Sequence, residues 1–180
     1  MNFIIFVVSI LIVSGFIGGA LAQQIPQLPT QEFSQEDIDY MSNKAVLITT
    51  NEGTMMIEVF PEDAPNHVHN FLKLVESGYY DGVIFHRIIP GFMIQTGDPN
   101  TKDLTTDRST WGSGGPGYQM EQEFNFLKHE RGIVSMARQS HPDTAGSQFF
   151  IVHHQSSFLD GQYTAFGKLV PLGNSHKTVT

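Results

Sequence analysis

Beyond residue 44 the sequence consists of short runs of apolar and β-branched residues, interrupted by glycine and proline. Runs of this length that end in turn-forming residues are typical of β-strands. One hairpin is indicated directly, because Asn51, Glu52 and Gly53 separate the first two runs. The predicted strands cover 45–49, 54–60, 83–89, 92–95, 132–137, 148–153 and 164–170. This pattern favours a mainly β fold, either a barrel or a sandwich capped by helices.

A single segment has the period of an amphipathic helix. Pro65 stands at its start and Gly78 just past its end, as is usual for helices. Its apolar positions are Val68, Phe71, Leu72 and Val75. The residues from 97 to 118 are rich in Gly, Asp, Thr and Pro, and they predict a long loop.

Composition excludes several classes of protein. The 180 residues contain no cysteine, which rules out a disulfide scaffold, a thiolate zinc site and a cysteine nucleophile. There are 18 acidic and 10 basic side chains, a net charge of −8, and no cluster of Lys or Arg. A non-specific nucleic-acid binder or a protein of anionic membrane surfaces is therefore not expected.

The first 31 residues carry no charged side chain. An apolar run over 3–17 is followed by Ala-Leu-Ala at 20–22, which is the pattern of a secretory signal peptide cleaved before Gln23. The alternative is an uncleaved membrane anchor over 3–22, because this segment is long enough to span a bilayer. Either reading predicts a secreted or extracytoplasmic protein. Residues 23–43, with their prolines, glutamines and acids, predict a polar linker with at most a short helical turn over 34–40.

Six ordered motifs make the sequence specific. They are FHRIIPGFMIQ at 85–95, GD at 97–98, GGPGY at 114–118, GSQFFI at 146–151, FLDG at 158–161 and FGK at 166–168. In order and spacing the chain resembles the cyclophilins, which are peptidyl-prolyl cis-trans isomerases, over a domain at 44–169. The resemblance implies a closed antiparallel eight-stranded β-barrel capped by helices. It also implies that the protein accelerates rotation about X-Pro bonds in exported proteins.

This reaction needs neither a nucleophile nor a metal, and no cofactor is expected. It needs a site that binds the twisted amide better than either planar isomer. Arg87 matches the family's catalytic arginine, and its permanent charge suits a donor aimed at the prolyl nitrogen. Taken alone, Arg87 would be read as a surface arginine in a salt bridge. Its place within the 85–95 motif favours the catalytic role.

The resemblance also assigns the residues that bind substrate, a proline-containing segment of an unfolded or folding protein. Gln95 and Gln148 match side chains that hold the substrate backbone, and Ala137 and Arg138 match the edge that pairs with it. The apolar slot and its aromatic wall are assigned to Phe92, Met93, Phe150, Phe158, Leu159 and Tyr163.

Two departures from the family pattern affect these expectations. The family often has an indole where this chain has Phe158, so weaker binding of cyclosporin is expected. After Leu169 the family continues with a helix and the strand that closes the barrel, whereas residues 170–180 form a short atypical tail. The sequence therefore predicts a barrel without its last helix and closing strand, and with an open edge.

Other motifs favour ordinary structural roles. Gly112, Gly114 and Gly117 match a dinucleotide fingerprint, but no predicted strand leads into them. The pairs His67/His69 and His153/His154 lack the spacing of a metal site. Two alternatives to a monomeric isomerase stay open: a proline-peptide binding or chaperone module without turnover, and an inactive truncated fragment.

Overall fold

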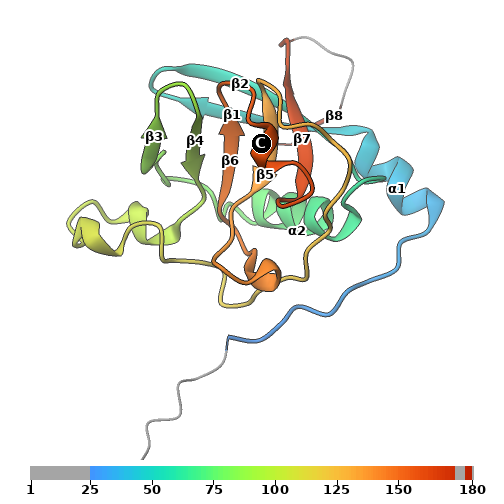
Figure 1. Cartoon of the computed structure of the whole chain (residues 1–180), viewed down its shortest axis with the longest axis horizontal. Helices are drawn as coiled ribbons and strands as arrows, with labels where there is room; N and C mark the ends of the chain where they lie inside the picture. Colours follow the sequence, from blue (N-terminus) through green and yellow to red (C-terminus); the bar gives the residue numbers. More distant parts are fainter. Residues whose placement is uncertain (1–24, 173–176, 180) are drawn as a thin grey trace, which may run out of the picture.

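The computed structural model describes residues 25–172 and 177–179. In this part of the chain the strands form one curled sheet in the order β3-β4-β6-β5-β7-β2-β1-β8, with helices beside it (Figure 1). All ladders among β1 to β7 are antiparallel, so the predicted mainly β class is confirmed. The strands are β1 (Lys44–Thr50), β2 (Gly53–Val59), β3 (Arg87–Ile89), β4 (Met93–Thr96), β5 (Ile133–Met136), β6 (Phe149–Val152), β7 (Ala165–Val170) and β8 (Lys177–Val179). The α-helices are α1 (Gln35–Ser42) and α2 (Pro65–Glu76), and short 3-10 turns are η1 (Pro99–Lys102), η2 (Arg108–Thr110), η3 (Pro142–Thr144) and η4 (Ser157–Leu159).

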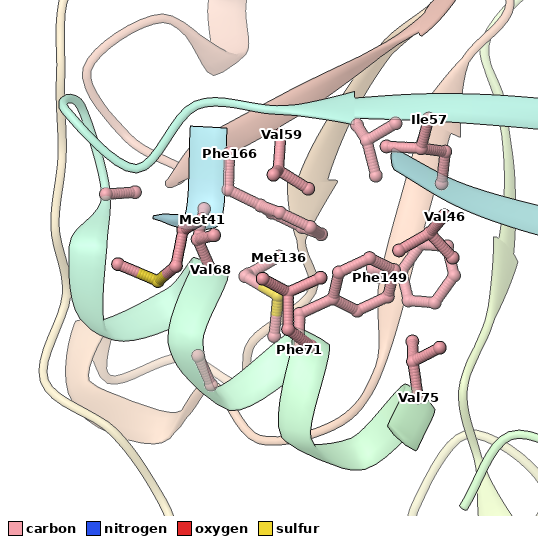
Figure 2. Close-up of a cluster of buried hydrophobic side chains, with 14 of the residues drawn as sticks. Met41, Val46, Ile57, Val59, Val68, Phe71, Val75, Met136, Phe149 and Phe166 are labelled. Atoms are coloured by element: carbon pink, nitrogen blue, oxygen red, sulfur yellow. The ribbon is translucent and has the colours of Figure 1, made fainter. Parts of the chain in front are cut away.

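Helix α2 matches the prediction, with Pro65 at its start, and it lies against one face of the sheet (Figure 1). Its predicted apolar face is buried. Figure 2 shows Phe71 of this helix beside Phe149 and Phe166 of the sheet. The ring centroid of Phe71 lies 5.3 Å from that of Phe149 and 5.1 Å from that of Phe166. These edge-on contacts fix the helix to β6 and β7.

The segment before β1 differs from the expected linker. Residues 35–42 form a helix of two turns, begun by a capping box in which Ser34 and Asp37 bond each other's backbone N–H groups. Met41 of this helix is 3% exposed and belongs to the main core, where Phe33 and Ile38 also pack. The segment is therefore part of the folded body.

Strand β3 is shorter than the predicted 83–89. The backbone of Ile84 is held by side chains instead of by a neighbouring strand: its N–H donates to the Thr101 hydroxyl and its carbonyl accepts from the Thr96 hydroxyl. Residues 83–86 consequently run as a loop into the strand.

The sequence predicts a chain without its last helix and without the strand that closes the barrel. The structure adds one short strand after residue 169, β8, which pairs with β1 over Lys44–Val46. This ladder is parallel, unlike the others in the sheet. Strands β3 and β8 are the two edges, and no ladder joins them within residues 25–172 and 177–179. Closure into a complete eight-stranded barrel is therefore not seen in this part of the chain.

The predicted signal peptide or membrane anchor at 1–22 lies outside the described residues. Among the helices of the described ranges, none has the length and apolar composition that a membrane span needs.

Candidate active site

The strand register places three predicted site residues in one row. Arg87 of β3 lies opposite Gln95 of β4, and Gln95 lies opposite Phe150 of β6. The turn between β3 and β4 contains Gly91, whose φ of 76° is accessible to glycine at little cost. Because side chains alternate along a strand, Met93 faces the same side as Gln95. The tight turn thus brings the arginine, the amide and the apolar residues to one face.

These residues line a cavity of about 800 Å³. It brings together every predicted site residue except Gln148, namely Arg87, Phe92, Met93, Gln95, Ala137, Arg138, Phe150, Phe158, Leu159 and Tyr163. Gln148 lines a smaller neighbouring cavity of about 270 Å³. The two cavities share Gln95, Gly112, Ala137 and Arg138, so they are parts of one continuous depression.

The floor of the larger cavity is apolar and well packed. Met93 is 1% exposed, and Phe150 and Leu159 are each 5% exposed. Phe158 rises from the rim at 70% exposure, and its ring centroid lies 5.4 Å from that of Phe92. The arrangement offers an apolar slot for a small ring, with aromatic side chains at its edge.

A chain of hydrogen bonds connects Arg87 to the glycine-rich loop, residues 112–117. Arg87 Nη1 donates to Gln95 Oε1 at 3.2 Å, and Gln95 Nε2 donates to Gln148 Oε1 at 2.9 Å. Gln148 Nε2 then donates to the carbonyl of Gly114 at 2.8 Å. Each amide uses its oxygen on one side and its nitrogen on the other, so the position of the exposed guanidinium is coupled to the loop.

Asp98 anchors this loop from below. Its carboxylate is fully buried and accepts backbone N–H groups from Asn100, Gly112 and Gly114. Position 114 has to be glycine, because a Cβ there would lie 2.1 Å from Asp98 Oδ1. The anchored loop also brings Trp111 to the cavity.

The side chain of Arg138 forms part of the cavity wall. Its guanidinium lies over the Tyr163 ring at 4.5 Å and donates to the carbonyls of Gln139, Ser140 and Gln162. Next to it, the N–H of Ala137 donates to the carbonyl of Gln148, so this N–H is engaged inside the protein.

Three lining residues were not assigned from the sequence: His86, Arg108 and Gly112. The signal for His86 was its place beside Arg87 in the 85–95 motif. Burial lowers the pKa of His86, and the Asp98 carboxylate offsets only part of that effect. Within the described residues neither ring nitrogen of His86 has a hydrogen-bond partner.

A Ser–His–Asp set lies behind the floor of the cavity. His129 Nδ1 is 3.1 Å from Asp160 Oδ1, and its Nε2 is 3.0 Å from Ser135 Oγ. Ser135 is fully buried, and its hydroxyl donates to the carbonyl of Thr164. Burial lowers the pKa of His129, partly offset by the Asp160 carboxylate. A serine that is inaccessible and already bonded cannot attack a substrate, so the set is structural.

The remaining motifs have structural roles. Gly112, Gly114 and Gly117 lie in a loop that no strand enters. His67 is buried against Glu123, at 2.6 Å between Nδ1 and Oε2. No group of three His, Asp or Glu side chains in residues 25–172 and 177–179 has the geometry to hold a metal ion.

Comparison with known proteins gives matches over the same part of the chain. The model of the family described as cyclophilin type peptidyl-prolyl cis-trans isomerase/CLD matches residues 45–179. The peptidyl-prolyl cis-trans isomerase of Synechococcus elongatus is 45% identical over 122 residues, which are 68% of this chain and 77% of that protein. A probable peptidyl-prolyl cis-trans isomerase of Brucella abortus is 44% identical over 128 residues, covering 69% of this chain and 65% of that protein. A crystal structure of a cyclophilin type isomerase from Cryptosporidium parvum, determined in the presence of the dipeptide Ala-Pro, aligns with a TM-score of 0.62. It is 41% identical, and the alignment covers 73% of this chain and 81% of that one.

Proposed function

The chain belongs to the cyclophilin-type peptidyl-prolyl cis-trans isomerase family, and we propose that the cavity around Arg87 is the active site for this isomerisation. The observation that carries the proposal is the row formed by Arg87, Gln95 and Phe150 across β3, β4 and β6. It sets a permanently charged donor beside the buried apolar side chains of Met93, Phe150 and Leu159.

The chemistry follows from the amide bond. Its resonance creates a barrier of about 18–20 kcal/mol, and for X-Pro both planar isomers are accessible. In the twisted state the prolyl nitrogen loses conjugation and gains a lone pair that can accept a hydrogen bond. A guanidinium has five N–H donors, so the bond from Arg87 to Gln95 leaves donors for that nitrogen. A donor that binds the twisted state better than the planar ones lowers the barrier.

The other cavity residues hold the substrate in place. Met93, Phe150 and Leu159 enclose the proline ring, while Phe92 and Phe158 form its aromatic rim. Gln95 and Gln148 offer amide groups to the peptide backbone beside the ring. The substrate is a proline-containing segment of an unfolded or folding protein, and no step requires a cofactor.

Phe158→Ala tests the slot with little risk to folding, because this side chain is 70% exposed. We expect the variant to raise KM for a proline peptide by roughly five- to tenfold, since it removes one of the two aromatic side chains at the rim. The matched control is Phe126→Ala, which removes a phenylalanine that is 98% exposed and outside the cavity. Isomerisation kinetics of both variants and the parent decide the result. A parent protein that binds the peptide without accelerating its isomerisation would instead support the binding or chaperone module.

We also propose that the protein works outside the cytoplasm on exported proteins. The support is the uncharged stretch over 1–31 and the Ala-Leu-Ala triplet at 20–22. Mass spectrometry of the protein from its own cells is expected to give Gln23 as the N-terminal residue. An intact residue 1 in the membrane fraction would support an anchor over 3–22, and an intact chain in the cytoplasm would refute export. Weak cyclosporin binding and a monomeric state stay predictions.

A further inference from the structure

The described chain begins at Ile25, which lies at the edge of the candidate active site. We call Ile25–Leu28 the N-terminal strap. The N–H of Leu28 donates to the carbonyl of Gln119 at 2.7 Å, and the N–H of Gln119 donates to the carbonyl of Pro26 at 2.9 Å. This short parallel bridge fixes the strap backbone beside the glycine-rich loop.

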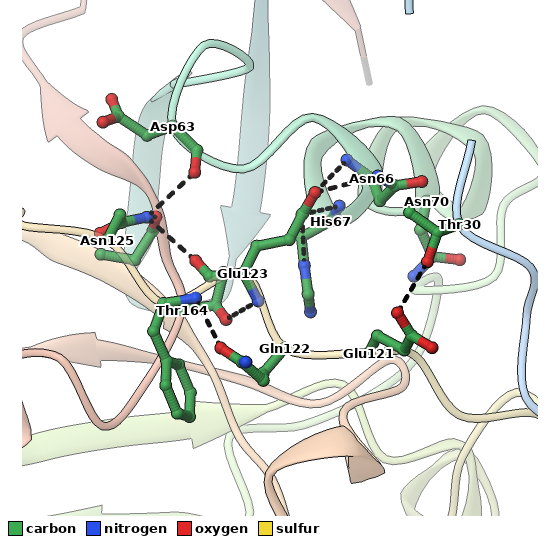
Figure 3. Close-up of polar contacts among 12 residues, drawn as sticks. Thr30, Asp63, Asn66, His67, Asn70, Glu121, Gln122, Glu123, Asn125 and Thr164 are labelled. Atoms are coloured by element: carbon green, nitrogen blue, oxygen red, sulfur yellow. Dashed lines mark hydrogen bonds and ion pairs between the residues drawn. The ribbon is translucent and has the colours of Figure 1, made fainter. Parts of the chain in front are cut away.

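Side chains reinforce the bridge on both sides. Gln27 Nε2 donates to the carbonyl of Asp143 at 2.9 Å. Farther along, the Thr30 hydroxyl donates to Glu121 at 3.0 Å, as Figure 3 shows. The N–H of Gln31 donates to the Asn66 side chain at the start of α2. These hydrogen bonds define the position of the segment, so Ile25 at its start can form part of a cavity wall.

That first residue, Ile25, lines the smaller cavity of about 270 Å³. Most of the other walls there are backbone or polar: the loop contributes Gly112, Gly114, Gly115 and Gly117, and the far side contributes glutamines and Thr144. Ile25 is the largest aliphatic side chain that lines the cavity, and it remains 50% exposed. Pro116, Tyr118 and Ala137 also line the cavity, and Ile25 adds a larger aliphatic side chain at its edge.

The position of the smaller cavity indicates which part of a substrate it contacts. It shares Gln95, Gly112, Ala137 and Arg138 with the larger cavity that encloses the proline ring. Because the two cavities adjoin, a peptide whose proline occupies the larger one can place a nearby residue in the smaller one.

We propose that Ile25 of the N-terminal strap is a specificity-determining residue, which favours peptides with a compact apolar residue within two positions of the proline. This inference rests on the proposed active site. It also gives the residues after the predicted cleavage point a role, because removal of 1–22 leaves the strap in the chain.

The experiment uses protein produced from the full 180-residue sequence. Proline peptides that carry glycine, leucine or glutamate at one position, either before the X-Pro pair or after it, are assayed with the parent and with Ile25→Ala. We expect Ile25→Ala to raise KM for the leucine peptide roughly fivefold, because apolar contact is lost. The kcat for all three peptides, and KM for the glycine and glutamate peptides, should stay nearly unchanged. Gln27→Ala, which removes the bond to Asp143, is expected to shift KM in the same direction. Leu172→Ala is the matched control, a 59% exposed leucine outside both cavities.

Equal changes for all peptides, no change for any, or a gain for the leucine peptide would each overturn the proposal. Thermal melts of the variants distinguish loss of folding from loss of contact. A parent protein without isomerase activity would contradict the proposed function itself, whereas an active parent with unchanged leucine preference in Ile25→Ala would contradict only the role of the strap.

Discussion

Replacing Arg87 by alanine is expected to lower kcat/KM for a proline peptide by about 10²–10³-fold, the usual cost of removing one preorganised donor to a transition state. The Arg87 side chain is exposed at the surface of the cavity, where it donates a hydrogen bond to Gln95. The loss should therefore appear mainly in kcat, because the apolar slot that binds the planar peptide stays intact. Peptide isomerisation followed by NMR exchange or by a coupled protease measures the effect.

Two further variants sharpen the test. Arg87→Lys keeps the charge but lacks the rigid fork that reaches both Gln95 and a substrate amide, so it should recover little activity. Arg131→Ala removes an exposed arginine that bonds only the His153 carbonyl among the described residues, and its activity should equal that of the parent. If Arg87→Ala retains parental turnover with an unchanged melting temperature, the catalytic role assigned to Arg87 is wrong.

Local patterns predicted the parts of this fold that depend on neighbouring residues. The spacing of Val68, Phe71 and Val75 identified α2, and the alternation in 92–95 put Met93 and Gln95 on one face. Helix α1 was underestimated because prolines and acids around it suggested a linker. The Ser34–Asp37 capping box was a local signal for that helix, whereas the burial of Met41 depends on tertiary packing.

Other features depend on residues far apart in the sequence and could not be derived from local patterns. Asp98 fixes the loop that carries Gly112 and Gly114, and the resulting position of Trp111 had no sequence signal beyond its place in that loop. The parallel pairing of β8 with β1 likewise depends on contacts across the sheet. The family resemblance supplied the site residues, since it reflects such long-range contacts where periodicity does not.

The start of α2 shows how much stability one distant side chain can supply. Ala64, at the cap position, makes no side-chain hydrogen bond to the helix. The carboxylate of Glu123 accepts the backbone N–H groups of Asn66 and His67 at 3.0 and 2.9 Å instead, and it also bonds both of their side chains (Figure 3). A negative group at a helix N-terminus is favoured by the free N–H groups and the helix dipole.

Glu123→Ala is therefore expected to lower the free energy of unfolding by about 3 kcal/mol, because it leaves several donors without their partner in a largely buried place. Denaturant unfolding measures this loss. The matched control is Glu121→Ala, an exposed glutamate that bonds only the Thr30 hydroxyl within the described residues. We expect that variant to remain within about 0.5 kcal/mol of the parent. Equal unfolding midpoints for the two variants would refute the capping role of Glu123.

The pH dependence provides an independent test of the same contact. Burial alone would raise the pKa of Glu123, but hydrogen bonds from His67 and Asn66 outweigh it and hold the pKa below its ordinary value. The unfolded chain thus binds a proton at higher pH than the folded protein, so the stabilisation is complete above the ordinary pKa of a glutamate. It is lost as the pH falls below about 4 through the lowered pKa of the folded state. The difference in unfolding free energy between the parent and Glu123→Gln should accordingly shrink over that range, and a difference independent of pH would show that the charge of Glu123 contributes nothing.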